Sequence, residues 1–429
     1  MRDVKLRNVK GTFDFSPKEQ KIRNYIQDTL KEIFEEYGYE PLETPTLCYY
    51  DVLASKYGAG AEILKEVYKL KDQGDRDLAL RYDLTVPFAR FTAMQKELRL
   101  PFKRYEIGKV FRDGPVKLGR NREFIQCDVD VIGVKDMMID AEFIDLYVKA
   151  FEKLGIDCYI EYNNKKLMNG IILEITTEDK INEVVTIVDK IKKISKEELN
   201  KEFKNIGLTD QDIITLYEDF SLSLSELEQK YSNNQLILEG IKEIREVEEY
   251  LDILNIKDKT VFTPTLARGH NIYTGTVYEV FAKNSKITSS IGGGGRYDKI
   301  ITNFIDDGNE YPASGISFGL ESIYEILKER LEDQPNLDVL IIPLNTKKQS
   351  LYLASELRKL GYKTDLIFND RKLNKVLNSA NKDGIPYIII LGEDEINKNI
   401  FKIKNMITGK EKEFSFAKTE EVKEFIERS

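Results

Sequence analysis

The chain has 429 residues, of which 41% are hydrophobic and 32% are charged, and its formal net charge is −9. This composition is typical of a soluble protein of two or three domains, and the net acidity argues against a general nucleic-acid coat. Because no apolar run reaches membrane-spanning length and no secretory signal is visible, we expect a cytoplasmic protein without membrane contact. The three scattered cysteines argue against a disulfide framework or a metal site, and the single histidine, His270, excludes a histidine-rich metal centre.

The first predicted element is an amphipathic helix that begins after Ser16. Ser16 is a typical N-cap, Pro17 suits the first helical position, and Glu19 stands at the capping-box position. Gly38 is expected to end the helix, and residues 39–53 predict an extended segment. The apolar residues that recur at helical spacing are Ile22, Tyr25, Ile26, Leu30, Ile33 and Phe34.

Strands and helices then alternate. Residues 77–91 predict a strand, a polar turn and a helix with Pro87 in its first turn. Residues 101–113 and 122–134 predict an antiparallel strand pair joined by a glycine-containing loop. A helix and a further strand are predicted over residues 140–155 and 158–164.

Arginines lie beside strand-like segments at two places that are far apart in the sequence. These arginines are Arg112, Arg120 and Arg122 at the first place and Arg268 at the second. Their planar guanidinium groups suit phosphate or carboxylate. After Phe124, the polar residues Gln126, Asp128 and Asp130 alternate, so a strand would place them on one face. A single arginine-rich segment of this kind is a solvated sheet face with surface ion pairs about as often as it is a binding site. Two segments of similar chemistry favour a pocket for a triphosphate and a small zwitterion.

The middle of the chain changes character. Residues 166–257 are rich in Lys, Glu, Ile and Leu at helical spacing, which predicts a helical insertion, although such stretches are usually solvated amphipathic bundles. Residues 258–330 return to strands and end in a helix. The glycines at 292–295 lack the spacing and the Lys-Ser/Thr ending of a P-loop, and a close backbone approach explains them better. After a polar linker, residues 336–429 alternate strands and helices, which predicts a small α/β domain with a mixed or parallel sheet.

Several motifs, in order along the chain, resemble those of histidyl-tRNA synthetases, a family of class II aminoacyl-tRNA synthetases. The second class II signature resembles FRDGPVKLGRNREFIQCDVD, and the third resembles GISFGLESIYEIL. The histidine-specific motif RGLDYYTG and its companion GGRYD resemble LARGHNIYTGTVYE and SSIGGGGRYDKI. The resemblance extends from KGTFDFSP near the N-terminus to the end of the chain.

The resemblance implies an α/β protein. Its catalytic domain, formed by residues 1–165 and 258–330, would be α+β and built on an antiparallel sheet flanked by helices. Residues 166–257 would be a helical insertion that contacts the tRNA acceptor arm, and residues 336–429 an anticodon-binding α/β domain. The resemblance also implies a homodimer formed through the first helix and the strand around Pro45. The implied reaction activates L-histidine with ATP and transfers it to tRNA(His), and Mg²⁺ accompanies ATP mainly through the phosphates.

The resemblance assigns roles to individual residues. Arg112 and Arg268 would act at the α-phosphate and the histidine carboxylate. Phe124 would stack on adenine, and the distal phosphates would meet Arg120 and Arg122. The residues implied around the histidine amine and imidazole are Asp83, Thr85, Gln126, Asp130, Tyr273 and Tyr297. No residue is implied as a metal ligand of the protein itself.

Three departures from the family pattern keep alternatives open. Ser322 stands where the third signature has arginine, Asn121 where the loop usually has tyrosine, and residues 270–272 read HNI in place of LDY. His270 itself is more simply a structural residue than a catalytic one. The preferred hypothesis is an active synthetase with a modified ATP site. The alternatives are a histidine-binding paralogue like the regulatory subunit of ATP phosphoribosyltransferase, and an RNA-binding or scaffold protein on a degraded synthetase fold.

Overall fold

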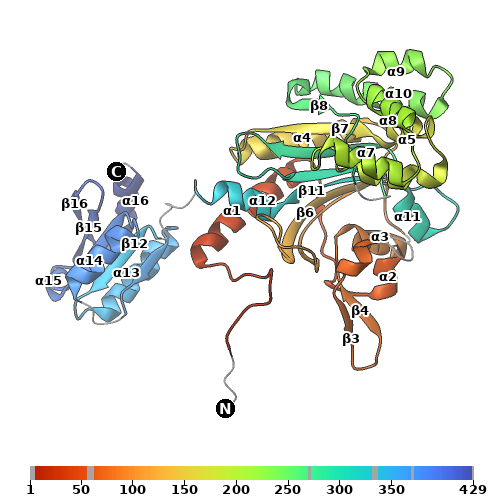
Figure 1. Ribbon diagram of the computed structural model, residues 1–429. Coiled ribbons are helices and arrows are strands. Elements are labelled where there is room, and N and C mark those ends of the chain that lie inside the picture. Colours follow the sequence, from red (N-terminus) through yellow and green to blue (C-terminus); the bar gives the residue numbers. More distant parts are fainter. Residues whose placement is uncertain are drawn as a thin grey trace. The chain divides into compact units, whose positions relative to one another are not determined.

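The computed structural model describes residues 5–55, 62–95, 97–268, 272–330, 337–368 and 372–427. The chain divides into two compact units, Met1–Glu329 and Arg330–Ser429 (Figure 1). Among the described residues, every helix is too short or too polar to span a bilayer.

The first unit is organised around a sheet of strand order β1-β5-β6-β11-β10-β9-β7-β8. Its strands are β1 (Glu40–Pro41), β5 (Phe102–Phe111), β6 (Glu123–Ile132), β7 (Cys158–Asn164), β8 (Thr260–Phe262), β9 (Thr276–Ala282), β10 (Gly292–Arg296) and β11 (Ala313–Gly319). The neighbouring strands are antiparallel except for the pairs β1–β5 and β7–β8. The predicted antiparallel pair is thus confirmed as β5 and β6, and it lies beside β11.

Helix α1 (Pro17–Glu36) begins as predicted. Ser16 and Glu19 form a reciprocal capping box, and Gly38 has the positive φ of a helix-ending glycine. The apolar residues at helical spacing are buried except for Tyr25, which is 42% exposed. Helix α1 packs against α4 (Met138–Lys153) and α12 (Leu320–Leu327).

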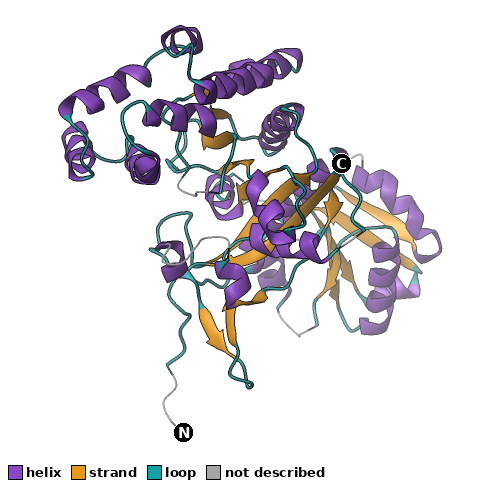
Figure 2. Ribbon diagram, turned by 90° about the vertical axis from the view of Figure 1, so that its right-hand side faces the viewer, coloured by secondary structure: helices purple, strands orange, loops and turns teal. Residues whose placement is uncertain are grey.

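The predicted extended segment after α1 is only partly correct. It forms β1 and β2 (Leu47–Tyr49), but its last residues begin helix α2 (Tyr50–Ala54). The Asp51 carboxylate accepts a hydrogen bond from the Val52 backbone N–H, which favours a helix start there. Strand β2 pairs with β4 (Asp77–Leu80), and β4 pairs with β3 (Lys69–Lys71). Figures 1 and 2 show the β3–β4 hairpin projecting from the large sheet, and helix α3 (Thr85–Met94) follows it.

The middle segment is helical, as predicted. Its helices are α5 (Lys165–Leu173), α6 (Ile181–Val188), α7 (Lys196–Asn205), α8 (Asp210–Asp219), α9 (Leu224–Lys230) and α10 (Gln235–Ile253). They gather beside β7 and β8 (Figure 1) and stand at the upper left of Figure 2. Helix α10 packs along α5 and α4, so this segment is part of the first compact unit.

The second unit is a mixed α/β domain of strand order β13-β12-β14-β15-β16. Strands β13, β12 and β14 are parallel, whereas β15 and β16 add in antiparallel fashion. Its elements are β12 (Val339–Pro343), α13 (Lys347–Lys359), β13 (Thr364–Leu366), α14 (Leu373–Lys382), β14 (Tyr387–Leu391), α15 (Glu393–Asn397), β15 (Ile400–Asn405), β16 (Glu411–Ser415) and α16 (Val422–Glu427). Its core includes Leu357, Ile389 and Phe401, each fully buried.

Candidate active site

A cavity of about 260 Å³ opens in the first unit beside β6, β10 and β11. It brings together most of the residues singled out from the sequence. Those that line it are Asp83, Thr85, Arg112, Phe124, Gln126, Asp130, Arg268, Tyr273 and Tyr297. The sequence separates these residues widely, so the fold itself assembles them.

Strand β6 supplies the floor. Phe124, Gln126, Asp128 and Asp130 all line the cavity, as the alternation along a strand requires. The side-chain amide of Gln126 donates to Ser317 Oγ at 3.1 Å, whereas its Oε1 is buried without a hydrogen-bond partner among the described residues. A buried acceptor without a partner costs free energy, so a ligand N–H at this position would be stabilising.

Buried ion pairs hold the charged residues of this floor and its neighbours in place. Arg104 is fully buried and contacts Asp130 at 2.7 Å, and Arg81 contacts Glu106 at 2.7 Å. The Tyr297 hydroxyl also donates to Asp130, and burial followed by the charge of Asp130 raises the pKa of that phenol. Asp130 is therefore held in one orientation by a charged and a neutral donor.

Arg112 and Arg268 both line the cavity. The Arg112 guanidinium lies 4.3 Å from the Tyr82 ring and 5.0 Å from the Phe124 ring, and its Nε donates to the Tyr82 carbonyl at 3.2 Å. Arg268 Nη1 donates to the Tyr278 carbonyl at 3.0 Å, while its Nε has no hydrogen-bond partner within the described ranges. Two guanidiniums beside one cavity suit a ligand with both phosphate and carboxylate groups.

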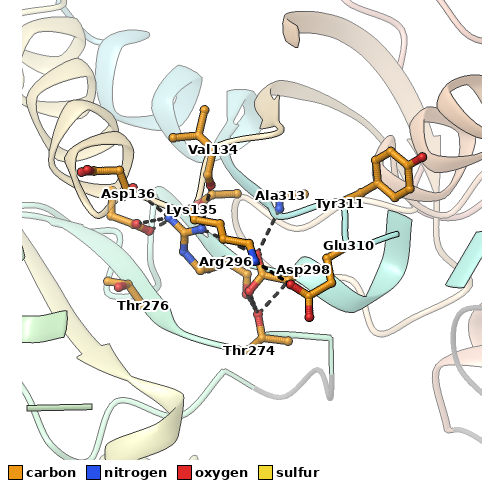
Figure 3. A network of polar contacts seen from close by, with 12 residues as sticks. Val134, Lys135, Asp136, Thr274, Thr276, Arg296, Asp298, Glu310, Tyr311 and Ala313 are labelled. Atoms are coloured by element: carbon orange, nitrogen blue, oxygen red, sulfur yellow. Dashed lines mark hydrogen bonds and ion pairs between the residues drawn. The ribbon is translucent and has the colours of Figure 1, made fainter. Parts of the chain in front are cut away.

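The glycines of β10 make room for this arrangement. A side chain on Gly293 would overlap the Arg268 guanidinium, and one on Gly315 of β11 would overlap the Asp130 carboxylate. At the end of β10, Arg296 is anchored to the carbonyls of Val134 and Asp136 (Figure 3). The neighbouring Tyr297 lines the cavity and donates its hydroxyl to Asp130.

Comparison with known proteins identifies the family. The family model for histidyl-tRNA synthetase matches residues 11–323, and the model for an anticodon binding domain matches residues 338–427. Histidine–tRNA ligase 1 of Bacillus thuringiensis subsp. konkukian is 48% identical over 95% of this chain and 97% of that relative. Histidine–tRNA ligase of Clostridium tetani is 34% identical over 96% of each chain.

The chain belongs to the histidyl-tRNA synthetase family. The solved histidyl-tRNA synthetase from Nostoc sp. PCC 7120 is 27% identical, with a TM-score of 0.85 over 98% of this chain and all of that one. A Bacillus halodurans protein described as an ATP phosphoribosyltransferase regulatory subunit/histidyl-tRNA synthetase is 21% identical, with a TM-score of 0.74 over 88% of this chain and 97% of that one. At that identity the second likeness concerns the fold alone. The resemblance inferred from the motifs is thereby confirmed.

Two arginines expected at the distal phosphates of a histidyl-tRNA synthetase do not line the cavity. Arg120 is exposed on the loop between β5 and β6. Arg122 contacts Asp113 at 2.8 Å and donates through Nε to the Gly114 carbonyl at 3.2 Å, so it braces that loop. Their contacts with ATP stay predictions. His270 and Asn271 lie outside the described residues.

Sequence reasoning did not assign some residues of this site. Asp128, Tyr82 and Ser317 line the cavity, and Glu279 lies 3.5 Å from Arg268. Asp128 stands in the same alternating series as Gln126 and Asp130, so that signal was present in the sequence. Ser317 and Glu279 lie on β11 and β9, so their place depends on which strands pair, and no local pattern carries that information, whereas Tyr82 directly precedes Asp83 after β4.

Ser322, the residue that departs from the third signature, is 7% exposed and faces two glycines. Its Oγ lies 3.5 Å from the Gly119 carbonyl, and a Cβ on Gly319 would lie 3.8 Å from it. Gly319 also lines the cavity, so Ser322 lies close to the site without lining it.

We therefore expect Ser322→Arg to lower the KM for ATP by about tenfold or more and to leave the KM for histidine unchanged. A charge-assisted hydrogen bond to a distal phosphate contributes about 1.5 to 3 kcal/mol. Pyrophosphate exchange at varied ATP and histidine concentrations measures both constants, with Ser322→Ala as the control. A KM for ATP that rises would show that the arginine displaces the loop at Gly119.

Proposed function

We propose that this chain is a histidine–tRNA ligase that activates L-histidine with ATP and transfers it to the 3′ end of tRNA(His). The family relationship supports an aminoacyl-tRNA ligase. The observation that carries the histidine-activating step is the cavity itself, in which two guanidiniums meet a floor of carboxylates and an amide. The phosphates of ATP and the carboxylate of an amino acid match the guanidiniums, and the ammonium group of the amino acid matches the carboxylates.

We assign the following roles within this cavity. Arg112 bridges the α-phosphate and the carboxylate, and Arg268 approaches the same groups from the β10 side. Phe124 stacks on adenine, and Arg120 and Arg122 serve the distal phosphates. The histidine amine and imidazole are bound by Asp83, Thr85, Gln126, Asp130, Tyr273 and Tyr297.

The proposed chemistry requires alignment and charge stabilisation. The histidine carboxylate attacks the α-phosphorus and pyrophosphate leaves, and a ribose hydroxyl of the tRNA then attacks the acyl carbon of the adenylate, loses its proton and displaces AMP. No nucleophile from the protein is needed, so catalysis depends on fixing the reactants and stabilising charge at phosphorus. The buried ion pair of Asp130 with Arg104 suits this task because it pre-orients the floor.

Magnesium enters this proposal with ATP. Mg²⁺ prefers to keep several waters and to bind through substrate phosphates, so we propose that the ion is carried mainly by the ATP phosphates. The bound ion would neutralise phosphate charge. We further propose that the segment at 166–257 contacts the tRNA acceptor arm and that the second unit contacts the anticodon. We place the protein in the cytoplasm.

Histidine-dependent exchange of pyrophosphate into ATP, followed by charging of tRNA(His), tests the proposal. A histidine–tRNA ligase performs both reactions. Exchange without charging contradicts the ligase assignment. Histidine binding without either reaction would establish the regulatory alternative, against which the anticodon-binding domain at residues 338–427 argues.

We also propose a homodimer that uses the region of α1 and Pro45. Two apolar side chains close to Pro45 are exposed: Leu47 is 50% exposed and Tyr49 is 52% exposed. A two-fold contact is the commonest oligomer type.

We expect light scattering to give the mass of a dimer at micromolar concentration, and we expect Leu47→Glu to shift that mass toward the monomer. Ile214→Glu, at a comparably exposed helical position, is the control and should leave the mass unchanged. A monomeric wild type would contradict the proposal.

A further inference from the structure

Asp128 is a carboxyl in the cavity floor to which none of the roles above applies. It stands between Gln126 and Asp130 on β6, faces Ser317 of β11 in register, and is 4% exposed. It lines the cavity directly. A buried carboxyl must be neutralised by a proton, a cation or several donors, because burial of a lone charge is costly.

The cations of the protein do not neutralise it. Arg104 is engaged with Asp130 and Arg81 with Glu106, and within the described residues Asp128 forms no ion pair. The hydrogen bonds of Asp128 come from neutral groups, namely the Gln126 amide at 3.4 Å and the Ser317 hydroxyl. Asp130 and Glu106 therefore take the two guanidiniums of this floor, and Asp128, which lines the cavity as Asp130 does, has no ion pair among the described residues.

Gln126 adds a second observation. Its Oε1 is buried and has no partner among the described residues, and both Gln126 and Asp128 line the same cavity. A free acceptor close to an uncompensated carboxyl calls for a ligand with several N–H donors and a positive charge. An ammonium group, with three donors and no acceptor, fits both requirements.

We propose that Asp128, together with Ser317 and Gln126, forms a further subsite that binds the cationic nitrogen group of the amino-acid substrate. The subsite rests on the proposed function, because histidine brings both an α-ammonium and an imidazole that can be protonated. In this role Asp128 is a substrate-binding residue and Ser317 a positioning residue that orients its carboxyl.

The subsite has a consequence for protons. Burial, followed by the charge of Asp130, raises the pKa of Asp128 to about 7, and Arg104 and the Ser317 hydrogen bond oppose this rise. The charged groups that face it from the neighbouring strands and loops are Asp83, Arg104, Glu106 and Asp130. The phenols that face it are Tyr147, Tyr273 and Tyr297. A bound cation favours the ionised carboxyl, so the subsite releases a proton when the substrate binds below about pH 8.

Calorimetry of histidine binding in two buffers of different ionisation enthalpy tests the subsite. For the wild type at pH 7 we expect release of about half a proton from Asp128, in addition to the contribution of histidine itself. Asp128→Asn keeps the shape and should remove that release and weaken histidine binding by about tenfold or more. Asp157→Asn changes a carboxyl that is 62% exposed and is the control.

Ser317→Ala gives a readout that a purely structural role would not move. Loss of the hydroxyl removes a hydrogen bond that lowers the pKa of Asp128, so the pH midpoint of histidine affinity should shift upward relative to the wild type. In Asp128→Asn the pH dependence due to this carboxyl should disappear. Titration of the free histidine is the same for all variants and cancels in the comparison.

Two analogues distinguish the groups of the substrate. Histidinol retains the ammonium and the imidazole, whereas 3-(imidazol-4-yl)propionate lacks the ammonium. If Asp128→Asn weakens only histidinol binding, the subsite holds the α-ammonium; if it weakens both, the subsite holds the imidazole. Unchanged affinity for both analogues, in a protein whose wild type exchanges pyrophosphate with histidine, overturns the subsite and leaves the proposed function intact. A wild type without exchange contradicts the proposed function instead.

Discussion

Arg268→Ala is expected to lower kcat for histidine-dependent pyrophosphate exchange by about 10² or more, with a much smaller effect on histidine affinity. Negative charge grows on the α-phosphoryl oxygens as the carboxylate attacks, so a guanidinium aimed at them contributes most in the transition state. The structure pre-organises Arg268 for this task. Its Nη1 is held by the Tyr278 carbonyl and Glu279, and its Nε is left without a partner among the described residues.

Single-turnover and steady-state exchange, with calorimetry for histidine, separate the two quantities. The control is Arg245→Ala, which removes a guanidinium that is 41% exposed and pairs with Glu228 between helices α9 and α10. It should leave exchange unchanged. Equal losses in histidine affinity and in rate would make Arg268 a ground-state contact, and an unchanged rate would remove it from the site. Gly293→Ala offers an independent check, because the added methyl group would displace the same guanidinium.

Features with a local cause could be predicted from the sequence. The capping box at Ser16 and Glu19 depends on residues three apart, and the face shared by Phe124, Gln126 and Asp130 depends only on strand alternation. Tyr25 shows the limit of such patterns. It has the right spacing for the core, but it lies at the edge of the apolar face and stays 42% exposed.

Features that depend on strand pairing could not be predicted. Asp130 stands opposite Arg104 on one side and opposite Gly315 on the other, and both neighbours follow from the order β5-β6-β11. The glycine of β11 leaves space for the carboxylate, and the arginine neutralises it. Neither partner lies within ten residues of Asp130, so periodicity along the chain carries no signal for this arrangement. The roles at the site were accessible only through the family motifs.

The ion pair between Arg296 and Asp140 also joins residues that are far apart in the sequence, and we expect it to contribute strongly to the stability of the fold. Asp140 on α4 is fully buried, and Arg296 Nη2 contacts it at 2.6 Å. Arg296 also donates to the carbonyls of Val134 and Asp136, and Figure 3 shows this guanidinium close to both backbone groups. The Tyr278 hydroxyl donates to the same carboxylate. The pair thereby connects α4 with β9 and β10, the strands that carry Tyr278 and Arg296.

Asp140→Ala is therefore expected to lower the free energy of unfolding by about 3 kcal/mol, because it leaves the buried Arg296 guanidinium with only the more distant, partly exposed Asp298 carboxylate, 3.6 Å away. Urea denaturation followed by circular dichroism measures the loss. The double variant Asp140→Leu with Arg296→Met should recover part of it, since it removes both buried charges, although the Tyr278 hydroxyl and the Val134 and Asp136 carbonyls lose these partners. Glu310→Ala is the control: its ion pair with Lys135 is solvent-exposed on both sides, and exposed pairs contribute little. An Asp140→Ala protein as stable as the Glu310→Ala protein would show that water or a rotated side chain neutralises Arg296, and the pair would then not hold β10 in place.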